Sequence, residues 1–151
     1  FVAFNTFQSL VQRPQQESAL RCIRQHLTPA GRFALSVFHP RHDRLAKKEL
    51  GWSRDQTFTD PASGRTVVRK DRTTYDLATQ TCIWMPHYEV RQADGTLITL
   101  EHRVPLHYFF RFEMELLLEK CGFAVEHLWG DRDRSPFTSD SPFMIFLARP
   151  S

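Results

Sequence analysis

The chain has 151 residues, the size of one ordinary domain, and 41% of them are hydrophobic. It holds only 6 Gly and 9 Pro, so its composition excludes disorder, collagen-like repetition and low-complexity linkers. The net charge of +3 comes from the first 50 residues, which carry 8 Lys and Arg against 3 Asp and Glu. These basic residues are scattered along the segment, which disfavours nucleic-acid binding. The chain opens on an uninterrupted apolar run, Phe1 to Phe4, an unusual start for a domain.

The cysteines indicate a reducing compartment. The three of them, Cys22, Cys82 and Cys121, are far apart and form no C-x-x-C pair, so neither a disulfide framework nor a zinc site is supported. No segment approaches the roughly 20 apolar residues that span a bilayer, and the first residues lack the basic region and cleavage site of a signal peptide. We therefore expect a cytoplasmic protein without a membrane partner.

The first fifty residues predict a βαβ unit. Phe1 to Phe7 has the nearly continuous apolar pattern of a strand buried on both faces of a parallel sheet. An amphipathic helix of about four turns begins near Pro14 and ends before Pro29. A second apolar strand covers 32–38, so the two strands should be parallel and the crossover right-handed.

The middle of the chain predicts an antiparallel meander. A short charged helix is expected over 41–50 and turns over 51–64. Four β-prone runs follow, 66–69, 73–77, 81–91 and 96–104, the last two joined by a hairpin at Ala93-Asp94-Gly95. Pro86 should lie at an edge or a bulge.

The last third returns to alternating helix and strand. From Pro105 onward an apolar stripe runs from Phe109 to Cys121 at helical spacing, with Gly122 as the residue that ends the helix. Closing strands are expected over 123–129 and 143–148. We thus divide the chain into a core part, 1–50, an antiparallel insert, 51–107, and a closing helix with two strands of the core, 108–151; the resemblance described next implies that the insert covers the substrate.

Three phrases, in order along the chain, resemble one enzyme family. Leu27-Thr28-Pro29-Ala30-Gly31-Arg32-Phe33 is similar to the phrase that precedes the fifth strand of class I S-adenosylmethionine-dependent methyltransferases. The run E-M-E-L-L-L-E-K-C-G-F, 113–123, resembles the helix before their sixth strand. The tail, with Gly130-Asp131, Ser135-Pro136-Phe137 and Met144-Ile145-Phe146, resembles the ending of a bacterial branch that methylates small molecules.

This resemblance implies an α/β fold: strands four to seven of a Rossmann-like methyltransferase sheet, with an antiparallel β insert. Phe1 to Phe7 would be the fourth strand, so the chain would be a truncated, C-terminal part of the enzyme. The cofactor of the parent protein would be S-adenosylmethionine, normally held by a glycine-rich loop and an acidic residue of the earlier strands. None of the six glycines here has G-x-G spacing, so we expect the chain alone to bind the cofactor poorly and to be inactive.

In the family, the carboxyl ends of strands four and five border the methyl group, which implies three cofactor-binding residues, Phe4, Asn5 and Phe7. His39 is the candidate general base, because a histidine side chain can take up a proton near neutral pH. The alternative for Asn5 is a turn residue that caps the strand, and for His39 an ordinary loop histidine before Pro40.

Four residues of the insert are candidates to line a pocket for the methyl acceptor: Tyr75, Trp84, Tyr88 and Arg103. At period two, Trp84 and Tyr88 share one face of a strand and His87 points to the other. The alternative is that these side chains serve packing or the surface.

The predicted activity is transfer of a methyl group to an oxygen or nitrogen atom of a small molecule. The alternative is a non-enzymatic ligand-binding or self-association module. We expect a homodimer through the apolar edge at Phe1 to Phe7, and no metal site, because Asp131, Asp133 and Asp140 lack the turn glycine and terminal Glu of a calcium loop.

Overall fold

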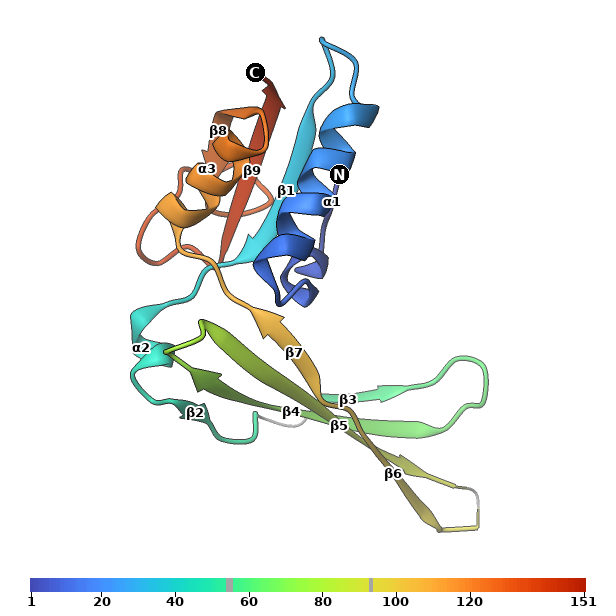
Figure 1. The fold of residues 1–151 in the computed structure, drawn as a ribbon. Helices are drawn as coiled ribbons and strands as arrows, with labels where there is room; N and C mark the ends of the chain where they lie inside the picture. The colour runs from blue at the N-terminus through green and yellow to red at the C-terminus, as the bar shows by residue number, and fades with distance from the viewer. Residues whose placement is uncertain (54–55, 93) are drawn as a thin grey trace. The chain divides into compact units, whose positions relative to one another are not determined.

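A computed structural model of the chain describes residues 1–53, 56–92 and 94–151. It divides them into two compact units (Figure 1). The first unit combines Phe1–His42 with Leu106–Ser151, and the second is Asp43–Pro105. The insert therefore begins earlier than the sequence pattern placed it, at 43 where we expected 51.

The first unit is built on a three-stranded antiparallel sheet. Its order is β1 (Phe33–Phe38), β9 (Phe143–Pro150) and β8 (Phe123–Trp129), so the two closing strands predicted from the sequence are confirmed. Leu35 lies opposite Phe146 in the central register, and both are fully buried. Alternate residues of β1 and β9 are buried, as expected for strands with one face on a core.

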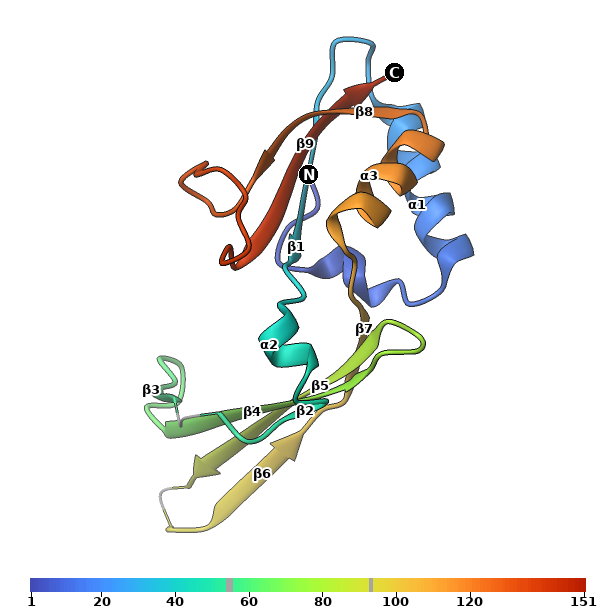
Figure 2. The ribbon, with the colours of Figure 1, turned by 90° about the vertical axis from the view of Figure 1, so that its left-hand side faces the viewer.

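Two helices, α1 (Arg13–His26) and α3 (Arg111–Lys120), cover one face of this sheet (Figure 2). Pro14 lies in the first turn of α1, where its missing N–H leaves no hydrogen bond unmade. At the start of α3, the Glu113 carboxylate accepts a hydrogen bond from the backbone N–H of Phe110 (3.2 Å). The core between helices and sheet includes Phe7, Leu20, Phe33, Phe109, Leu118 and Phe123.

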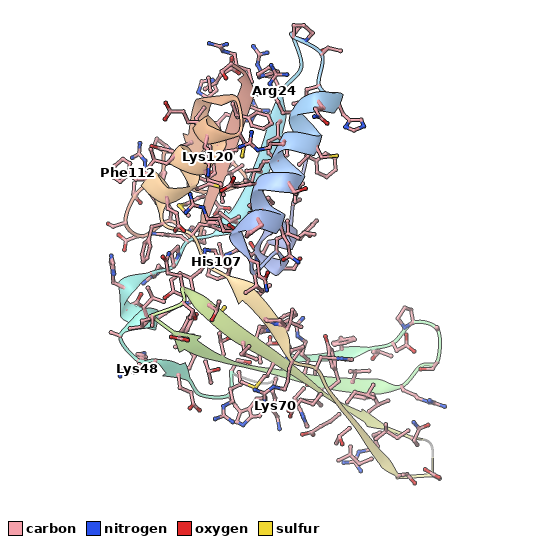
Figure 3. The ribbon with its side chains drawn as sticks, viewed as in Figure 1. Arg24, Lys48, Lys70, His107, Phe112 and Lys120 are labelled. Atoms are coloured by element: carbon pink, nitrogen blue, oxygen red, sulfur yellow. The ribbon has the colours of Figure 1, made fainter. Side chains whose placement is uncertain are left out.

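The helices are also joined at their surface. Lys120 of α3 donates a hydrogen bond to Glu17 of α1 (2.7 Å), and Arg24 of α1 donates to the carbonyl of Gly122 (3.0 Å; Figure 3). The hydrogen bond from Lys120 lowers the pKa of Glu17 below its ordinary value.

The predicted first strand is wrong in extent but right in direction. Val2 alone forms a bridge, parallel to Leu35: its N–H donates to Ala34 (2.9 Å) and its carbonyl accepts from Ser36 (3.0 Å). Phe4 and Asn5 then adopt left-handed backbone conformations, φ 55° and 62°, which cannot continue a strand. A short 3-10 helix, η1 (Thr6–Ser9), follows. Phe1 and Phe4 are accordingly exposed at 94% and 85%, where we expected burial on both faces.

The second unit is built on an antiparallel sheet. Its strands run in the order β2 (Glu49–Leu50), β4 (Thr66–Asp76), β5 (Thr81–Arg91) and β6 (Leu97–Glu101). In addition, β3 (Gln56–Thr59) pairs with β4, and β7 (Val104–His107) pairs with β5. The antiparallel meander is confirmed.

Four details of the insert differ from the sequence-based expectation. The runs 66–69 and 73–77 belong to the single strand β4, and β3 lies in a stretch where we expected only turns. The charged helix is one turn long, α2 (His42–Leu45), and the region after Pro105 begins as strand β7 before α3 starts. Of the predicted hairpin residues, Asp94 and Gly95 are described, and Ala93 lies outside the described residues.

Pro86 lies inside the central strand β5, not at an edge or bulge, opposite Asp71 of β4. The sheet tolerates it because the backbone of Asp71 is bonded on its other side: its N–H donates to Oγ of Ser53 and its carbonyl accepts from the N–H of Ser53 (both 2.8 Å). No proline N–H is therefore needed between Pro86 and Asp71. The Pro86 carbonyl accepts from the N–H of His102 (3.2 Å) on the other side.

Among the helices in the described part of the chain, none combines the length and the apolar character that crossing a membrane requires.

Candidate functional site

The candidate site lies where β1 ends. The parallel bridge of Val2 to Leu35 brings Phe4 and Asn5 to the same edge of the sheet as His39, which directly follows β1. The loop between β8 and β9, 130–142, borders this edge too, because Phe38 lies opposite Phe143 in the sheet. Ligands of open α/β sheets bind at the carboxyl ends of strands, so this edge is where chemistry is expected.

His39 is held in one orientation by the β8–β9 loop. Its Nδ1 lies 2.9 Å from the carbonyl oxygen of Ser141, and its backbone N–H donates to Pro142 (3.0 Å). The edge of the imidazole meets the ring of Phe137, with centroids 4.9 Å apart. A carbonyl can only accept a hydrogen bond, so Nδ1 carries the proton and Nε2 of the neutral ring is left as the basic nitrogen.

Phe4 and Asn5 contribute an exposed ring and an unsatisfied polar atom. The guanidinium of Arg132 lies 6.0 Å from the ring centre of Phe4 and 5.1 Å from that of Phe143. The Oδ1 atom of Asn5 is buried and has no hydrogen-bond partner. Asn5 is also the turn residue that begins η1, through its backbone and not its side chain. The two interpretations of this residue are thus compatible.

Phe7, the third predicted cofactor residue, has a different environment. It is 2% exposed and packs on Phe109, with ring centroids 5.6 Å apart. In this structure Phe7 is a core residue beneath the edge, whereas Phe4 is exposed and Asn5 is half-buried.

Sequence reasoning did not identify Gly130, Ser141 or Arg132 as parts of this edge. A Cβ on Gly130 would collide with Oγ of Ser141 and lie 2.9 Å from the carbonyl of Pro136, so only glycine allows the loop to close this tightly. Oγ of Ser141 in turn accepts a hydrogen bond from the N–H of Thr138 (2.9 Å). The sequence signal that could have indicated this tight loop is a glycine among aspartates and serines.

The acidic residues of the same loop shape its backbone. Asp131 accepts a hydrogen bond from the N–H of Arg132 (2.7 Å), and Asp133 accepts one from Ser135 (2.9 Å). The second bond lowers the pKa of Asp133. The described residues contain no group of three or more His, Cys, Asp or Glu arranged to hold a metal ion.

In the second unit, Trp84 and Tyr88 share one face of β5 with Arg69 and Asp71 of β4. The Arg69 guanidinium lies 5.5 Å from the centre of the Trp84 ring system and 5.9 Å from that of Tyr88. Asp71 holds this arrangement, since its carboxylate accepts hydrogen bonds from Arg69 (3.1 Å) and from Nε1 of Trp84 (3.0 Å).

The other predicted acceptor residues lie apart from this pair. Tyr75 is on the same face but opposite Cys82, six residues from Tyr88, or about 20 Å along the strand. Arg103 is exposed in the connection between β6 and β7. On the opposite face, His87 lies with Lys70, Glu89 and Trp52 around a hollow of about 440 Å³.

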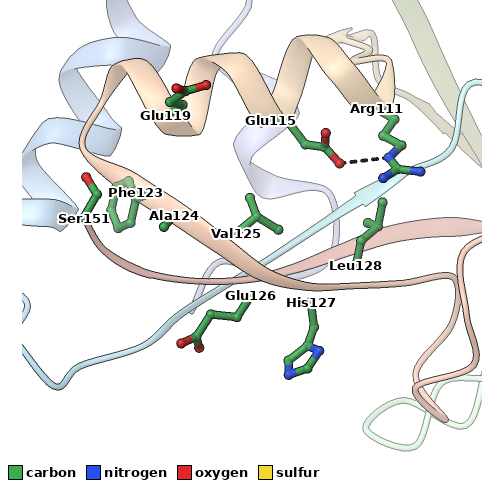
Figure 4. A pocket seen from close by; sticks show the side chains of 10 residues that line it. All are labelled: Arg111, Glu115, Glu119, Phe123, Ala124, Val125, Glu126, His127, Leu128 and Ser151. Carbon is green, nitrogen blue, oxygen red and sulfur yellow. Dashed lines mark hydrogen bonds and ion pairs between the residues drawn. The ribbon is translucent and has the colours of Figure 1, made fainter.

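A larger open groove of about 560 Å³ runs along β8 and α3 (Figure 4). Its lining includes Glu119, Glu126 and the ion pair of Arg111 with Glu115 (2.8 Å). It contains none of the residues predicted to bind cofactor or acceptor, so we do not assign the chemistry to it.

No family model and no curated protein matches the chain. Solved structures do. The CcbJ methyltransferase from Streptomyces caelestis is 23% identical, with a TM-score of 0.72 over 98% of this chain and 58% of that one. The S-adenosylmethionine-bound amino pentose methyltransferase CalS10 from Micromonospora echinaspora is 18% identical, with a TM-score of 0.74 over 99% and 56%. An S-adenosylmethionine-dependent methyltransferase from Clostridium acetobutylicum is 10% identical, with a TM-score of 0.75 over 98% and 56%.

The chain spans a little over half the length of these structures. Its parallel bridge, crossover helix, antiparallel insert and two closing strands follow one another as the three sequence phrases implied. Over nearly its whole length, the chain therefore has part of the fold of the class I S-adenosylmethionine-dependent methyltransferases.

Proposed function

We propose that this chain is part of an enzyme that transfers a methyl group from S-adenosylmethionine to an oxygen or nitrogen atom of a small molecule. The glycine-rich loop and the acidic residue that hold the cofactor in such enzymes have no counterpart here, so the chain alone is inactive in this proposal. The observation that carries it is the placement of Phe4, Asn5 and His39 at the same edge of a methyltransferase-like sheet.

The residues at this edge fit one end of the cofactor. A buried polar atom without a partner costs about 1 to 3 kcal/mol, and Oδ1 of Asn5 is such an atom. An ammonium group, such as that of the methionine moiety, would supply the missing donor. The exposed Phe4 ring offers an apolar surface beside it. When bound, S-adenosylmethionine supplies an electrophilic methyl group.

His39 would remove the proton that the acceptor atom loses. Its Nδ1 is committed to Ser141, and Nε2 is therefore free to accept a proton from an amine or hydroxyl group. Phe137 restricts the ring from the side, which keeps Nε2 in one direction. General-base catalysis of this kind contributes about 100-fold or more to a rate.

The acceptor class is guided by the similar structures, which include an amino pentose methyltransferase. An amino sugar carries both the amine and the hydroxyl groups that this proposal allows. The second unit offers an aromatic face, Trp84 and Tyr88, of the kind that lines small-molecule sites.

The test uses the full-length protein, including any residues that are encoded upstream of Phe1. It is incubated with S-adenosylmethionine and a panel of amine-bearing and hydroxyl-bearing sugars, and S-adenosylhomocysteine is measured. We expect product with at least one acceptor, and a rate lower by about 100-fold in His39→Asn. The control is His26→Asn, because His26 is an exposed helix residue bonded to the carbonyl of Cys22, and this change should leave the rate unaltered.

The outcomes separate the two candidate functions. Binding of S-adenosylmethionine in a calorimeter with no product from any acceptor would favour the ligand-binding module. If His39→Asn forms product at the unchanged rate, the methyltransferase activity stands, but His39 is not its general base.

A further inference from the structure

Strand β6 is an apolar strand without cover. Its sequence is Leu-Ile-Thr-Leu-Glu, and all five residues are exposed, with Ile98 at 43% and Leu100 at 52%. It ends the strand order of its sheet, and in the described part of the chain it pairs with β5 alone. An exposed edge of this composition is a template for another strand.

The backbone groups on the free edge can be identified from the register. Gln92 donates to the carbonyl of Thr96 (2.8 Å), and His102 donates to the carbonyl of Pro86 (3.2 Å). In an antiparallel pair such residues alternate, so the even-numbered residues of β6 direct their backbone groups to β5. Leu97, Thr99 and Glu101 consequently direct their N–H and C=O groups outward.

We propose that β6 pairs antiparallel with β6 of a second copy of this chain, about a two-fold axis at Thr99. In this register Leu97 lies opposite Glu101 of the second copy, and Thr99 lies opposite Thr99. All three outward-facing residues of each copy then exchange backbone hydrogen bonds, so the pairing is complete and self-complementary. The two insert sheets become one continuous sheet.

The side chains agree with the same register. Ile98 lies opposite Leu100 of the second copy in a non-hydrogen-bonded pair, where side chains approach most closely, and this contact occurs twice. Both residues are on the face of the sheet that carries Trp84 and Tyr88, because Leu100 is opposite Tyr88. The dimer thus extends this apolar face across the axis.

Charge also favours a second copy as the partner. Glu101 is the only charged residue of β6, and the register keeps the two Glu101 side chains apart. Arg91 of β5 is opposite Leu97 in its own chain, so it shares a face with Glu101 of the second copy, two strand spacings or about 10 Å away. An arginine and a glutamate side chain together bridge that distance, and the pair forms twice.

The first test is the mass in solution, by sedimentation equilibrium over a range of concentrations. We expect a species of twice 17.7 kDa for the chain. Leu100→Lys should shift it to the monomer, because lysine at this position opposes the apolar pair. Leu77→Lys is the matched control, since Leu77 is a leucine of the same unit, 47% exposed and outside β6, and it should leave the dimer intact.

The second test examines the proposed register directly, and it does not depend on a substitution that weakens the dimer. Thr99→Cys in a Cys22→Ser background should be joined into a covalent dimer by a short thiol-specific cross-linker, because opposed Cα atoms of such a pair lie about 5.5 Å apart. Cys22 is replaced because it is the exposed native thiol. A monomeric chain at high concentration, a dimer that survives Leu100→Lys, or a Thr99→Cys protein that the cross-linker leaves monomeric would each overturn the proposal. Survival of the dimer would point instead to the segment Phe1 to Phe7.

Discussion

The side chain of Gln8 accepts a hydrogen bond from the backbone N–H of Phe38 (3.1 Å), the residue before His39. Its amide also donates to the carbonyl of His107 (3.1 Å), and the side chain is fully buried. One glutamine thus joins η1, the end of β1 and the segment that enters α3. The position of the candidate base rests on this buried polar contact.

Replacement of Gln8 by Leu should lower the free energy of unfolding by about 1 to 3 kcal/mol, because it leaves the part-buried N–H of Phe38 and the part-buried carbonyl of His107 without their hydrogen-bond partner. Urea titration followed by circular dichroism measures this change. Gln25→Leu, at an exposed position of α1, is the control and should change the free energy of unfolding by less than about 0.5 kcal/mol. Equal effects of the two substitutions would show that the Gln8 contacts do not stabilise the fold.

Gly122 should resist substitution for a conformational reason. It has φ 84°, in the left-handed region, directly after α3, as the sequence predicted for the residue that ends this helix. Gly122→Ala should therefore cost about 1 to 2 kcal/mol in the free energy of unfolding, measured by urea titration. Gly51→Ala is the control, because a Cβ there meets no atom within 4 Å and the backbone has no positive φ, and it should be nearly neutral.

Periodicity predicted the elements whose apolar residues face a core. The helix at Pro14 and the closing strand β9 both carry a repeating pattern that burial imposes. Phe1 to Phe7 misled because an apolar run reports hydrophobicity and not backbone conformation. The left-handed turn at Phe4 and Asn5 arises where the chain leaves its bridge to β1, and no local pattern announces it.

The residues of the candidate site fall into two groups, those that local sequence patterns predicted and those that they did not. His39, Phe4 and Asn5 could be named because they flank strands, and strand ends locate the ligand edge of a parallel pair. Gly130, Ser141 and Arg132 come from a loop about 100 residues later, and their role depends on the register of Phe38 with Phe143. That register is a tertiary contact, which a single sequence does not reveal.

Cys82 should be the least reactive thiol near neutral pH. It is 2% exposed, and burial raises its pKa to about 11, so only about one molecule in a thousand carries the thiolate at pH 8. Iodoacetamide labelling followed by mass spectrometry should modify the exposed Cys22 first and Cys82 only after addition of urea. Rapid labelling of Cys82 in the folded chain would contradict its burial.

The same pKa shift predicts a loss of stability in base. Above pH 9 the unfolded chain ionises Cys82 and the folded chain does not, so the stabilisation present below pH 9 is lost progressively towards pH 11. Urea titrations at pH 8 and pH 10.5 measure the decline. It should be smaller in Cys82→Ala, which has no thiol to ionise, and an unchanged decline would assign the effect to other groups.

Asp71 should be energetically coupled to Trp84, and this coupling fixes the aromatic face of the insert. Its carboxylate accepts the indole N–H (3.0 Å) and pairs with Arg69, whose guanidinium lies near the rings of Trp84 and Tyr88. A hydrogen bond to a charged acceptor contributes about 1.5 to 3 kcal/mol, and the partial exposure of Asp71 places it at the lower end.

A double-mutant cycle of Trp84→Phe with Asp71→Ala, followed by urea unfolding, should therefore give a coupling energy of about 1.5 kcal/mol. The control cycle pairs Trp84→Phe with Asp76→Ala, because the Asp76 carboxylate accepts hydrogen bonds from its own turn at Ala78 and Thr79, and its coupling should be near zero. Equal coupling in both cycles would mean that Asp71 does not hold the indole. A larger coupling for Asp71 would mean that its carboxylate fixes the Trp84 indole on this face of the sheet.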